Sequence, residues 1–158
     1  MKLLEDIKFI IDDEIFKKLT TCVKNASPYE ACGLIFGEIN EKKVEDGFQY
    51  HYLGQKFECI ESTNKSTVAF LIDNIEELNE IYKTAAEKYN KRLISIFHSH
   101  PAGSYPSGVD TDNMEHLNEF KLFKNLIWTI MSAGNYDLNG FIYFNKEFYQ
   151  ILVEIKKE

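Results

Sequence analysis

Two histidines separated by one residue follow directly after an apolar run. This stretch constrains the fold and the chemistry of the chain more than any other. The run covers residues 93–97 and leads into His98, Ser99 and His100. Side chains two residues apart in a strand point to the same side, so a strand over 93–97 would project both imidazoles from its end. Asp110 follows later in the same stretch. Two imidazoles and one carboxylate form a suitable three-ligand set for a zinc ion that keeps one coordination position open.

The alternative is that the two histidines lie on an exposed loop without a ligand. For a lone histidine that interpretation would be the better one, but the sequence continues as HxHP and then as PSxxD. Pro101 and Pro106 fix their backbone φ angles, which lowers the entropy lost when the loop holds ligands together. The pattern therefore favours a metal site over an exposed histidine pair.

A zinc-bound water in the fourth position would be acidified toward neutral pH and would supply hydroxide. Attack on a carbonyl also requires a general base and a hydrogen-bond donor for the oxyanion. Ser107 is the candidate donor, and its competing role is the N-cap of a helix that has Asp110 in its first turn. Because one hydroxyl has one proton, we expect the two roles to hold in different states.

Glu30 is the candidate base, because it opens the apolar segment 30–38, where burying a carboxylate is costly unless it has a partner or a task. A solvated carboxylate just before the strand is an equally good interpretation of the residues alone. Asp112, Glu115 and His116 follow on the expected helix after the metal loop. His116 could in principle be a further ligand, but for all three we expect a solvated helix face.

The rest of the chain alternates between strand-like and helix-like segments. We expect strands over residues 7–11, 30–38, 48–53, 57–61, 68–72, 93–97, 126–131, 138–144 and 148–155, although the last segment also fits a helix. We expect helices from a cap at Asp12 or Asp13 to about residue 25, over 74–89 behind an Asp73 cap, and over 111–123. Residues 39–47 are polar and are interpreted as a hairpin connection. The mixture predicts a single α+β domain over residues 1–158, an α/β-like sandwich with a mixed, largely antiparallel sheet flanked by helices.

Composition narrows the class of protein further. A length of 158 residues suits one domain with a sizeable core, and a net charge of −7 argues against nucleic acid as the main partner. No apolar run approaches membrane-spanning length, and the first residues become acidic too early for a signal peptide, so we expect a cytoplasmic protein without a membrane partner. Cys22, Cys32 and Cys59 are odd in number and form no CxxC pair, which predicts reduced thiols rather than a disulfide. Small apolar neighbours predict that Cys32 is packed and inert.

These residues together resemble the JAMM (MPN-plus) metalloprotease family, also called Mov34/MPN/PAD-1. The family pattern is a glutamate near the start, then HxHP, a short loop and SxxD, and it maps onto Glu30, His98, His100, Ser107 and Asp110. Residues 28–34, PYEACGL, are similar to the family's P-x-E-x-C-G-L segment, and Asn64 and Phe70 also match. The resemblance extends over nearly the whole chain.

The resemblance implies a cytidine-deaminase-like MPN/JAMM fold and a zinc isopeptidase, with one Zn²⁺ per chain bound by His98, His100 and Asp110. It implies that Glu30 handles the protons of the attacking water and that Ser107 stabilises the tetrahedral intermediate. Family members of the deubiquitinase type cut after the C-terminal glycine of ubiquitin or a ubiquitin-like modifier. The expected partner is therefore a ubiquitin-like (or small archaeal) modifier protein or its conjugates.

The chain departs from the family in one place. The segment 101–106 is one residue shorter than in the common pattern, so its path is expected to differ while the metal site is kept. The compact size fits a prokaryotic or archaeal member. Two other functions stay open: trimming the C-terminus of a ubiquitin-fold sulfur-carrier protein, and a non-catalytic MPN module that binds a modifier or assembles with a homologue. A homodimer is one such assembly.

Overall fold

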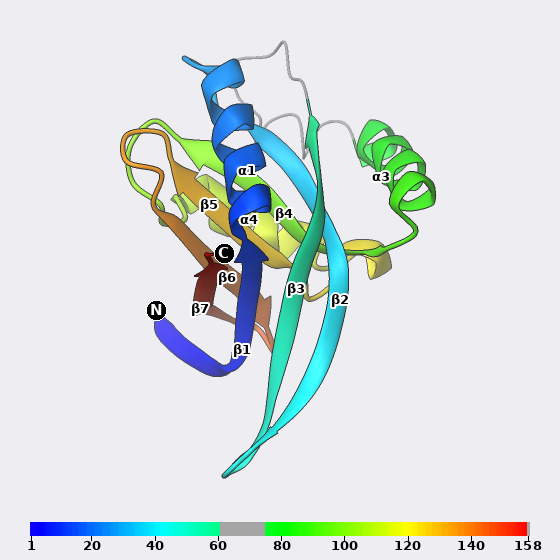
Figure 1. The fold of residues 1–158 in the computed structure, drawn as a ribbon, viewed down its shortest axis with the longest axis vertical. Helices are drawn as coiled ribbons and strands as arrows, with labels where there is room; N and C mark the ends of the chain where they lie inside the picture. Colours follow the sequence, from blue (N-terminus) through cyan, green and yellow to red (C-terminus); the bar gives the residue numbers. More distant parts are fainter. Residues whose placement is uncertain (61–74, 158) are drawn as a thin grey trace.

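The computed structural model describes residues 1–60 and 75–157, and its strands close into a barrel (Figure 1). The strands are β1 (Lys2–Asp12), β2 (Cys32–Val44), β3 (Gly47–Ile60), β4 (Arg92–His100), β5 (Ile127–Ser132), β6 (Leu138–Phe144) and β7 (Glu147–Lys156). The helices are α1 (Asp13–Ala26), α3 (Ile75–Tyr89) and α4 (Gly108–Leu117), and a 3-10 turn, η1 (Lys121–Phe123), precedes β5. The strand expected over 68–72, the Asp73 cap, and the matches at Asn64 and Phe70 lie outside the described residues.

The strand order around the barrel is β1-β3-β2-β4-β5-β6-β7. β1 pairs in parallel with β3 and with β7, β4 pairs in parallel with β5, and the other four described pairings are antiparallel. This mixed, largely antiparallel sheet with its helices confirms the predicted α+β class. The prediction of a sandwich is wrong, because β1 bonds to both β3 and β7 and so joins the two ends of the sheet.

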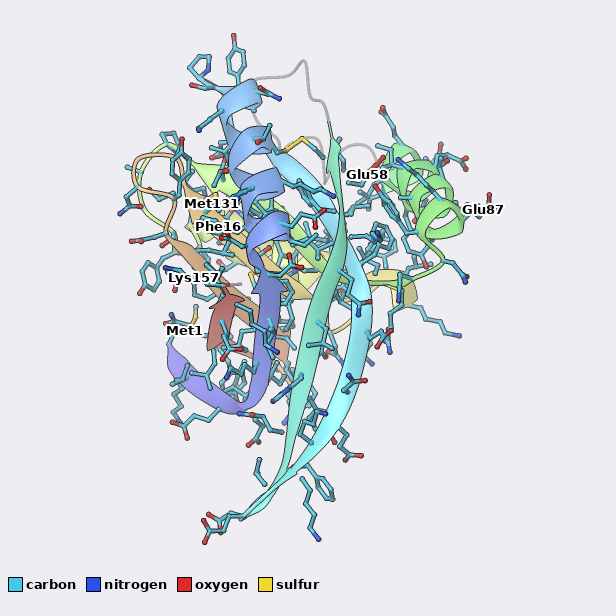
Figure 2. All side chains as sticks on the ribbon, in the orientation of Figure 1. Met1, Phe16, Glu58, Glu87, Met131 and Lys157 are labelled. Carbon is cyan, nitrogen blue, oxygen red and sulfur yellow. A yellow bond between two sulfur atoms is a disulfide. The ribbon has the colours of Figure 1, made fainter. Side chains whose placement is uncertain are left out.

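Alternating side chains give the sheet two apolar faces. One face packs under α1 and includes Phe9, Phe97 and Leu19; Phe16 and Met131, labelled in Figure 2, belong to the same cluster. The other face packs against α3 and α4 and consists of a second set of buried side chains, including Leu34, Ile96, Leu78, Leu117 and Trp128. The ring of His98 contacts Trp128 at 6.1 Å between centroids, so the histidine pair belongs to this second face.

The helices begin and end where the sequence signals them. The Asp12 side chain accepts a hydrogen bond from the backbone N–H of Ile15 at 2.9 Å, which confirms the predicted cap of α1. α3 covers the described part of the helix expected over 74–89. The hydroxyl of Tyr89 donates to Glu58 Oε2 at 2.7 Å, which links the last turn of α3 to β3. None of the helices within 1–60 and 75–157 is long and apolar enough to cross a membrane.

The long ribbon formed by β2 and β3 corrects the prediction of a loop over residues 39–47. Each residue from Glu38 to Val44 has a partner in β3, and the turn consists only of Glu45 and Asp46. Most of these side chains are exposed, so the polar composition reflects a solvated ribbon and not a loop. The predicted break at Gly54 is also wrong: an added Cβ there would lie 2.7 Å from the Ile11 side chain, so the glycine permits close packing inside one continuous strand.

Smaller differences concern the ends of elements. β1 begins at Lys2 instead of residue 7, because pairing with β7 extends it. The helix expected over 111–123 is α4 followed by η1, and the last segment of the chain is the strand β7 and not a helix.

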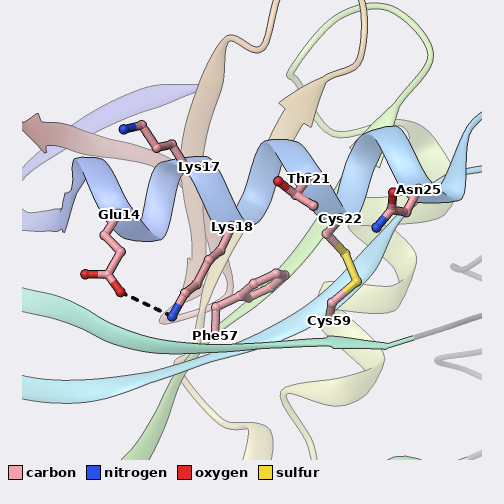
Figure 3. Close-up of a pocket in the computed structure, with 8 residues that line it drawn as sticks. All are labelled: Glu14, Lys17, Lys18, Thr21, Cys22, Asn25, Phe57 and Cys59. Atoms are coloured by element: carbon pink, nitrogen blue, oxygen red, sulfur yellow. Dashed lines mark ion pairs between the residues drawn. A yellow bond between two sulfur atoms is a disulfide. The ribbon is translucent and has the colours of Figure 1, made fainter.

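A disulfide between Cys22 and Cys59 joins α1 to β3 (Figure 3) and corrects the prediction of reduced thiols. The two cysteines are 37 residues apart and come from different elements, which is why their spacing in the sequence gave no sign of the pair. Cys32 is the free cysteine of the described residues. Its side chain is fully buried, and burial raises its pKa to about 12, so the prediction of a packed, inert thiol is confirmed.

Candidate metal centre

The last residues of β4 and the first turn of α4 bring two imidazoles and one carboxylate together. Within the strand, His98 and His100 point to the same side, and their Nε2 atoms are 3.2 Å apart. Asp110 closes the group: its Oδ2 lies 2.9 Å from Nε2 of His100, and its Oδ1 lies 3.2 Å from Nε2 of His98. The three predicted ligands therefore converge on one point, as the spacing of the sequence led us to expect.

These distances agree with a tetrahedral zinc site. With zinc–ligand bonds of about 2.0–2.1 Å and tetrahedral angles, neighbouring ligand atoms should be about 3.3 Å apart. The three separations of 2.9–3.2 Å fall slightly below this value, so small outward movements would complete the geometry. A nitrogen and oxygen set of this kind suits Zn²⁺ better than the all-oxygen sites preferred by Mg²⁺ or Ca²⁺.

Burial makes the group costly unless a cation is present. The side chains of His98 and Asp110 are 0% and 1% exposed, and that of His100 is 14% exposed, so the centre opens to solvent on the His100 side. Asp110 Oδ1 accepts no hydrogen bond from any described residue although it is buried. A buried carboxylate oxygen without a donor is the expected state of a metal ligand. His98 Nδ1 is also buried without a described partner.

The electrostatics of the centre follow from these contacts. Burial raises the pKa of Asp110, but the hydrogen bond with His100 and the close approach of the His98 ring outweigh burial and hold the pKa of Asp110 well below its usual range. The hydrogen bond to Asp110 raises the pKa of His100 against the opposing effect of burial, and the negative charge of Glu30 adds to the rise. Asp110 is therefore ionised at all moderate pH values, and protons compete with a metal for His100.

Ser107 and Asp110 form the start of α4. The Ser107 hydroxyl accepts the backbone N–H of Asp110 at 3.1 Å, and Asp110 Oδ2 accepts the backbone N–H of Ser107 at 2.8 Å, which together make a capping box. The cap uses a lone pair of the hydroxyl and leaves its proton for another acceptor. The expectation that capping and oxyanion donation need different states is therefore wrong. The same box orients the Asp110 carboxylate toward the histidines.

Glu30 is brought to the edge of this centre by the pairing of β2 with β4. Cys32 lies opposite His98 in the register, and Ala31 forms hydrogen bonds with Ser99, the residue between the two histidines. Glu30 is partly buried, and its charge acts on His100. The structure thus places Glu30 at the edge of the group formed by His98, His100 and Asp110, although the sequence separates it from His98 by almost seventy residues.

The shortened loop between β4 and α4 is fastened to β5 and β6. The backbone N–H of Gly103 donates to Ser132 Oγ at 3.2 Å, and Asn139 Nδ2 donates to Ser104 Oγ at 2.7 Å. Gly103 has a φ of +85°, which favours glycine. The ring of Tyr105 packs at 5.7 Å from that of Phe141, a residue of β6. The loop is therefore held by residues that no motif identified.

The other polar residues of α4 agree with the sequence interpretation, with one addition. Asp112, Glu115 and His116 are exposed, which confirms the solvated helix face. Asn113, one turn after Asp110, is 1% exposed, and its Nδ2 has no partner among the described residues. Its position three residues after a ligand is the signal that could have identified it, because residues at that spacing share a helix face.

A pocket of about 240 Å³ lies beside the ends of α1 and β4. The end of α1, the end of β4 and the turn after β5 enclose it; its lining includes Tyr29, Ser99, His100, Pro101 and Gly134. A larger pocket of about 390 Å³, shown in Figure 3, lies between α1 and β3 near the disulfide and contains none of the three ligands. The smaller pocket includes one of the three candidate ligands, His100.

Comparisons with known proteins agree with this geometry. The family described as prokaryotic homologues of the JAB domain matches residues 12–142, which include all five residues of the proposed site. No curated protein matches the sequence. The fold is similar to the solution structure of a Desulfitobacterium hafniense protein, with a TM-score of 0.66 and 19% identity over 95% of this chain and 94% of that one.

The fold is also similar to the crystal structure of a JAB1/MPN domain protein from Archaeoglobus fulgidus, with a TM-score of 0.52 and 14% identity over 94% of this chain and 98% of that one. At these identities the two structures show the fold alone. The family match covers most of the chain and confirms the resemblance to JAMM/MPN proteins. The chain therefore belongs to the prokaryotic homologues of the JAB domain.

Proposed function

We propose that the protein is a zinc-dependent isopeptidase that hydrolyses the bond after the C-terminal glycine of a ubiquitin-like modifier. The observation that carries this proposal is the convergence of His98, His100 and Asp110 to within 3.2 Å of one another, with Glu30 at their edge. The complete ligand set supports an enzyme, because a non-catalytic module has no need of three ligand-type side chains at these distances.

We assign each of these groups a role in the hydrolysis of an amide. Bound zinc would acidify a water and polarise the carbonyl of the scissile bond. Glu30 would accept a proton from the attacking water and deliver it to the lysine amine as the carbon–nitrogen bond breaks. The Ser107 hydroxyl would donate a hydrogen bond to the developing oxyanion. Its O–H is available for this, because in the cap of α4 the hydroxyl only accepts. His100 is the ligand nearest to solvent, so the substrate would approach from its side.

The substrate would bind with its C-terminal tail extended beside the sheet, with its backbone paired to a strand edge. A glycine before the scissile bond has no side chain, which fits a narrow approach to a buried centre. The chemistry would be the same for a sulfur-carrier protein of ubiquitin fold, and the assay below separates the two by the substrate supplied.

The test compares zinc-loaded protein with two variants on a glycine-linked modifier conjugate and on a modifier with a short C-terminal extension. We expect cleavage by the wild type, loss of cleavage on chelation, and recovery when zinc is restored. Glu30→Gln should bind one zinc and fail to turn over. Glu115→Gln, which alters an exposed carboxylate of α4, is the matched control and should remain active.

Full activity in Glu30→Gln would refute the role of Glu30 as the base. A wild type that binds zinc and cleaves neither substrate would favour the non-catalytic alternative.

A further inference from the structure

Ser99 forms two hydrogen bonds with the residue that follows Glu30. The Ser99 backbone N–H donates to the carbonyl of Ala31 at 3.1 Å, and the Ala31 N–H donates to the Ser99 hydroxyl at 2.8 Å. The first bond is a regular link between neighbouring antiparallel strands. The second ends on a side chain, whereas a regular pair would exchange a second backbone bond. The Ser99 hydroxyl thus links the residue that precedes β2 to the end of β4.

Both partners are buried, so this link is not easily replaced by water. Ala31 is 2% exposed and Ser99 is 1% exposed. A buried N–H that loses its acceptor pays the full cost of desolvation unless the backbone moves to find another. The position of Ala31 therefore depends on the Ser99 hydroxyl.

These hydrogen bonds connect the two parts of the proposed site through residues that are adjacent to them in the sequence. Ser99 lies between His98 and His100, and Ala31 is bonded directly to Glu30. Any displacement of Ala31 from β4 moves the Glu30 backbone relative to both histidines. Small misplacements of a catalytic group have large effects on rate.

We propose that Ser99 is a positioning residue that holds Glu30 in register with the metal ligands. This inference rests on the proposed function, because it concerns Glu30 as the base. One consequence of the proposal does not involve the substrate: the Ser99 hydroxyl, and not zinc, orders the segment that carries Glu30. The middle residue of the HxH motif, Ser99, would then position Glu30, while the two histidines on either side of it bind the metal.

The test uses three variants of the full chain. Ser99→Ala removes the acceptor, and Ser99→Thr keeps the hydroxyl. The pocket of about 240 Å³ beside Ser99 offers room for the added methyl group. Ser95→Ala is the matched control, because Ser95 is also fully buried in β4, but its hydroxyl pairs with Thr129 at 3.1 Å, away from Ala31.

We expect Ser99→Ala to retain one zinc per chain, with kcat at saturating zinc lower by about 10- to 100-fold and KM little changed. Amide hydrogen exchange at Ala31 should be faster by a similar factor in zinc-free and zinc-loaded protein. Ser99→Thr should restore both readouts to within a few-fold of wild type. Ser95→Ala should change neither, even where it lowers thermal stability.

Three results would overturn the inference. One is Ser99→Ala with wild-type kcat. Another is unchanged exchange at Ala31. The third is a Ser99→Ala protein that binds zinc more weakly but has the wild-type kcat at saturating zinc, because Ser99 would then support the metal ligands and not Glu30. A wild type without hydrolytic activity would refute the proposed function and this inference together, whereas activity that survives in Ser99→Ala would refute the inference alone.

Discussion

Replacing Ser107 by alanine separates the two roles that its hydroxyl combines. As the N-cap of α4, the hydroxyl accepts the Asp110 N–H, and loss of such a cap costs about 1 kcal/mol. For a chain of this size, that corresponds to a fall in Tm of roughly 2–4 °C. As an oxyanion donor, the same hydroxyl should contribute about 100- to 1,000-fold to kcat. The Ser107 backbone N–H still donates to Asp110 in the variant, so zinc binding should persist.

The assay combines thermal unfolding, zinc titration and turnover of the glycine-linked conjugate. Asp12→Ala is the matched control, because it removes the side-chain cap of α1, a helix that contributes no ligand to the centre. Both variants should lose similar stability, but only Ser107→Ala should lose activity. A Ser107→Ala protein that is less stable and still turns over at the wild-type rate would show that the hydroxyl serves only as a cap.

Three further predictions concern the cysteines and the protonation of the centre. Reducing the Cys22–Cys59 disulfide, which spans 37 residues, should lower the free energy of unfolding by about 4 kcal/mol, and an unchanged urea midpoint would contradict the link between α1 and β3. Cys32, with its pKa raised to about 12, should resist iodoacetamide at pH 8 in the folded protein and react fully in urea; rapid labelling of folded protein would exclude the packed thiol. Zinc affinity should fall as pH decreases through the raised pKa of His100, because the metal must displace a proton there, while Asp110 stays ionised; a pH-independent affinity by calorimetry would argue against His100 as a ligand.

The three candidate ligands could be predicted from the sequence because the information is local. Two histidines in one strand share a side by the period of two, and Asp110 lies in the first turn of the helix that begins directly after the loop. The caps of α1 and α4 were predictable for the same reason. Glu30 required the family resemblance, since its approach to the ligands depends on the pairing of β2 with β4.

Most of the features that the sequence did not predict depend on contacts between distant elements. The anchoring of the loop by Ser132 and Asn139, and the pairing of Cys22 with Cys59, depend on how strands and helices meet. Closure of the barrel depends on β1 bonding to two strands at once. The ribbon of β2 and β3 was missed for another reason: its side chains are largely exposed, so it lacks the apolar pattern that identifies a strand.

X-ray absorption at the zinc edge of the loaded protein tests the central claim most directly. We predict one zinc per chain with four nitrogen or oxygen ligands at about 2.0–2.1 Å, and no bound zinc in Asp110→Ala under the same conditions. A sulfur ligand at about 2.3 Å, or zinc retained at full stoichiometry in that variant, would contradict a centre built from His98, His100 and Asp110.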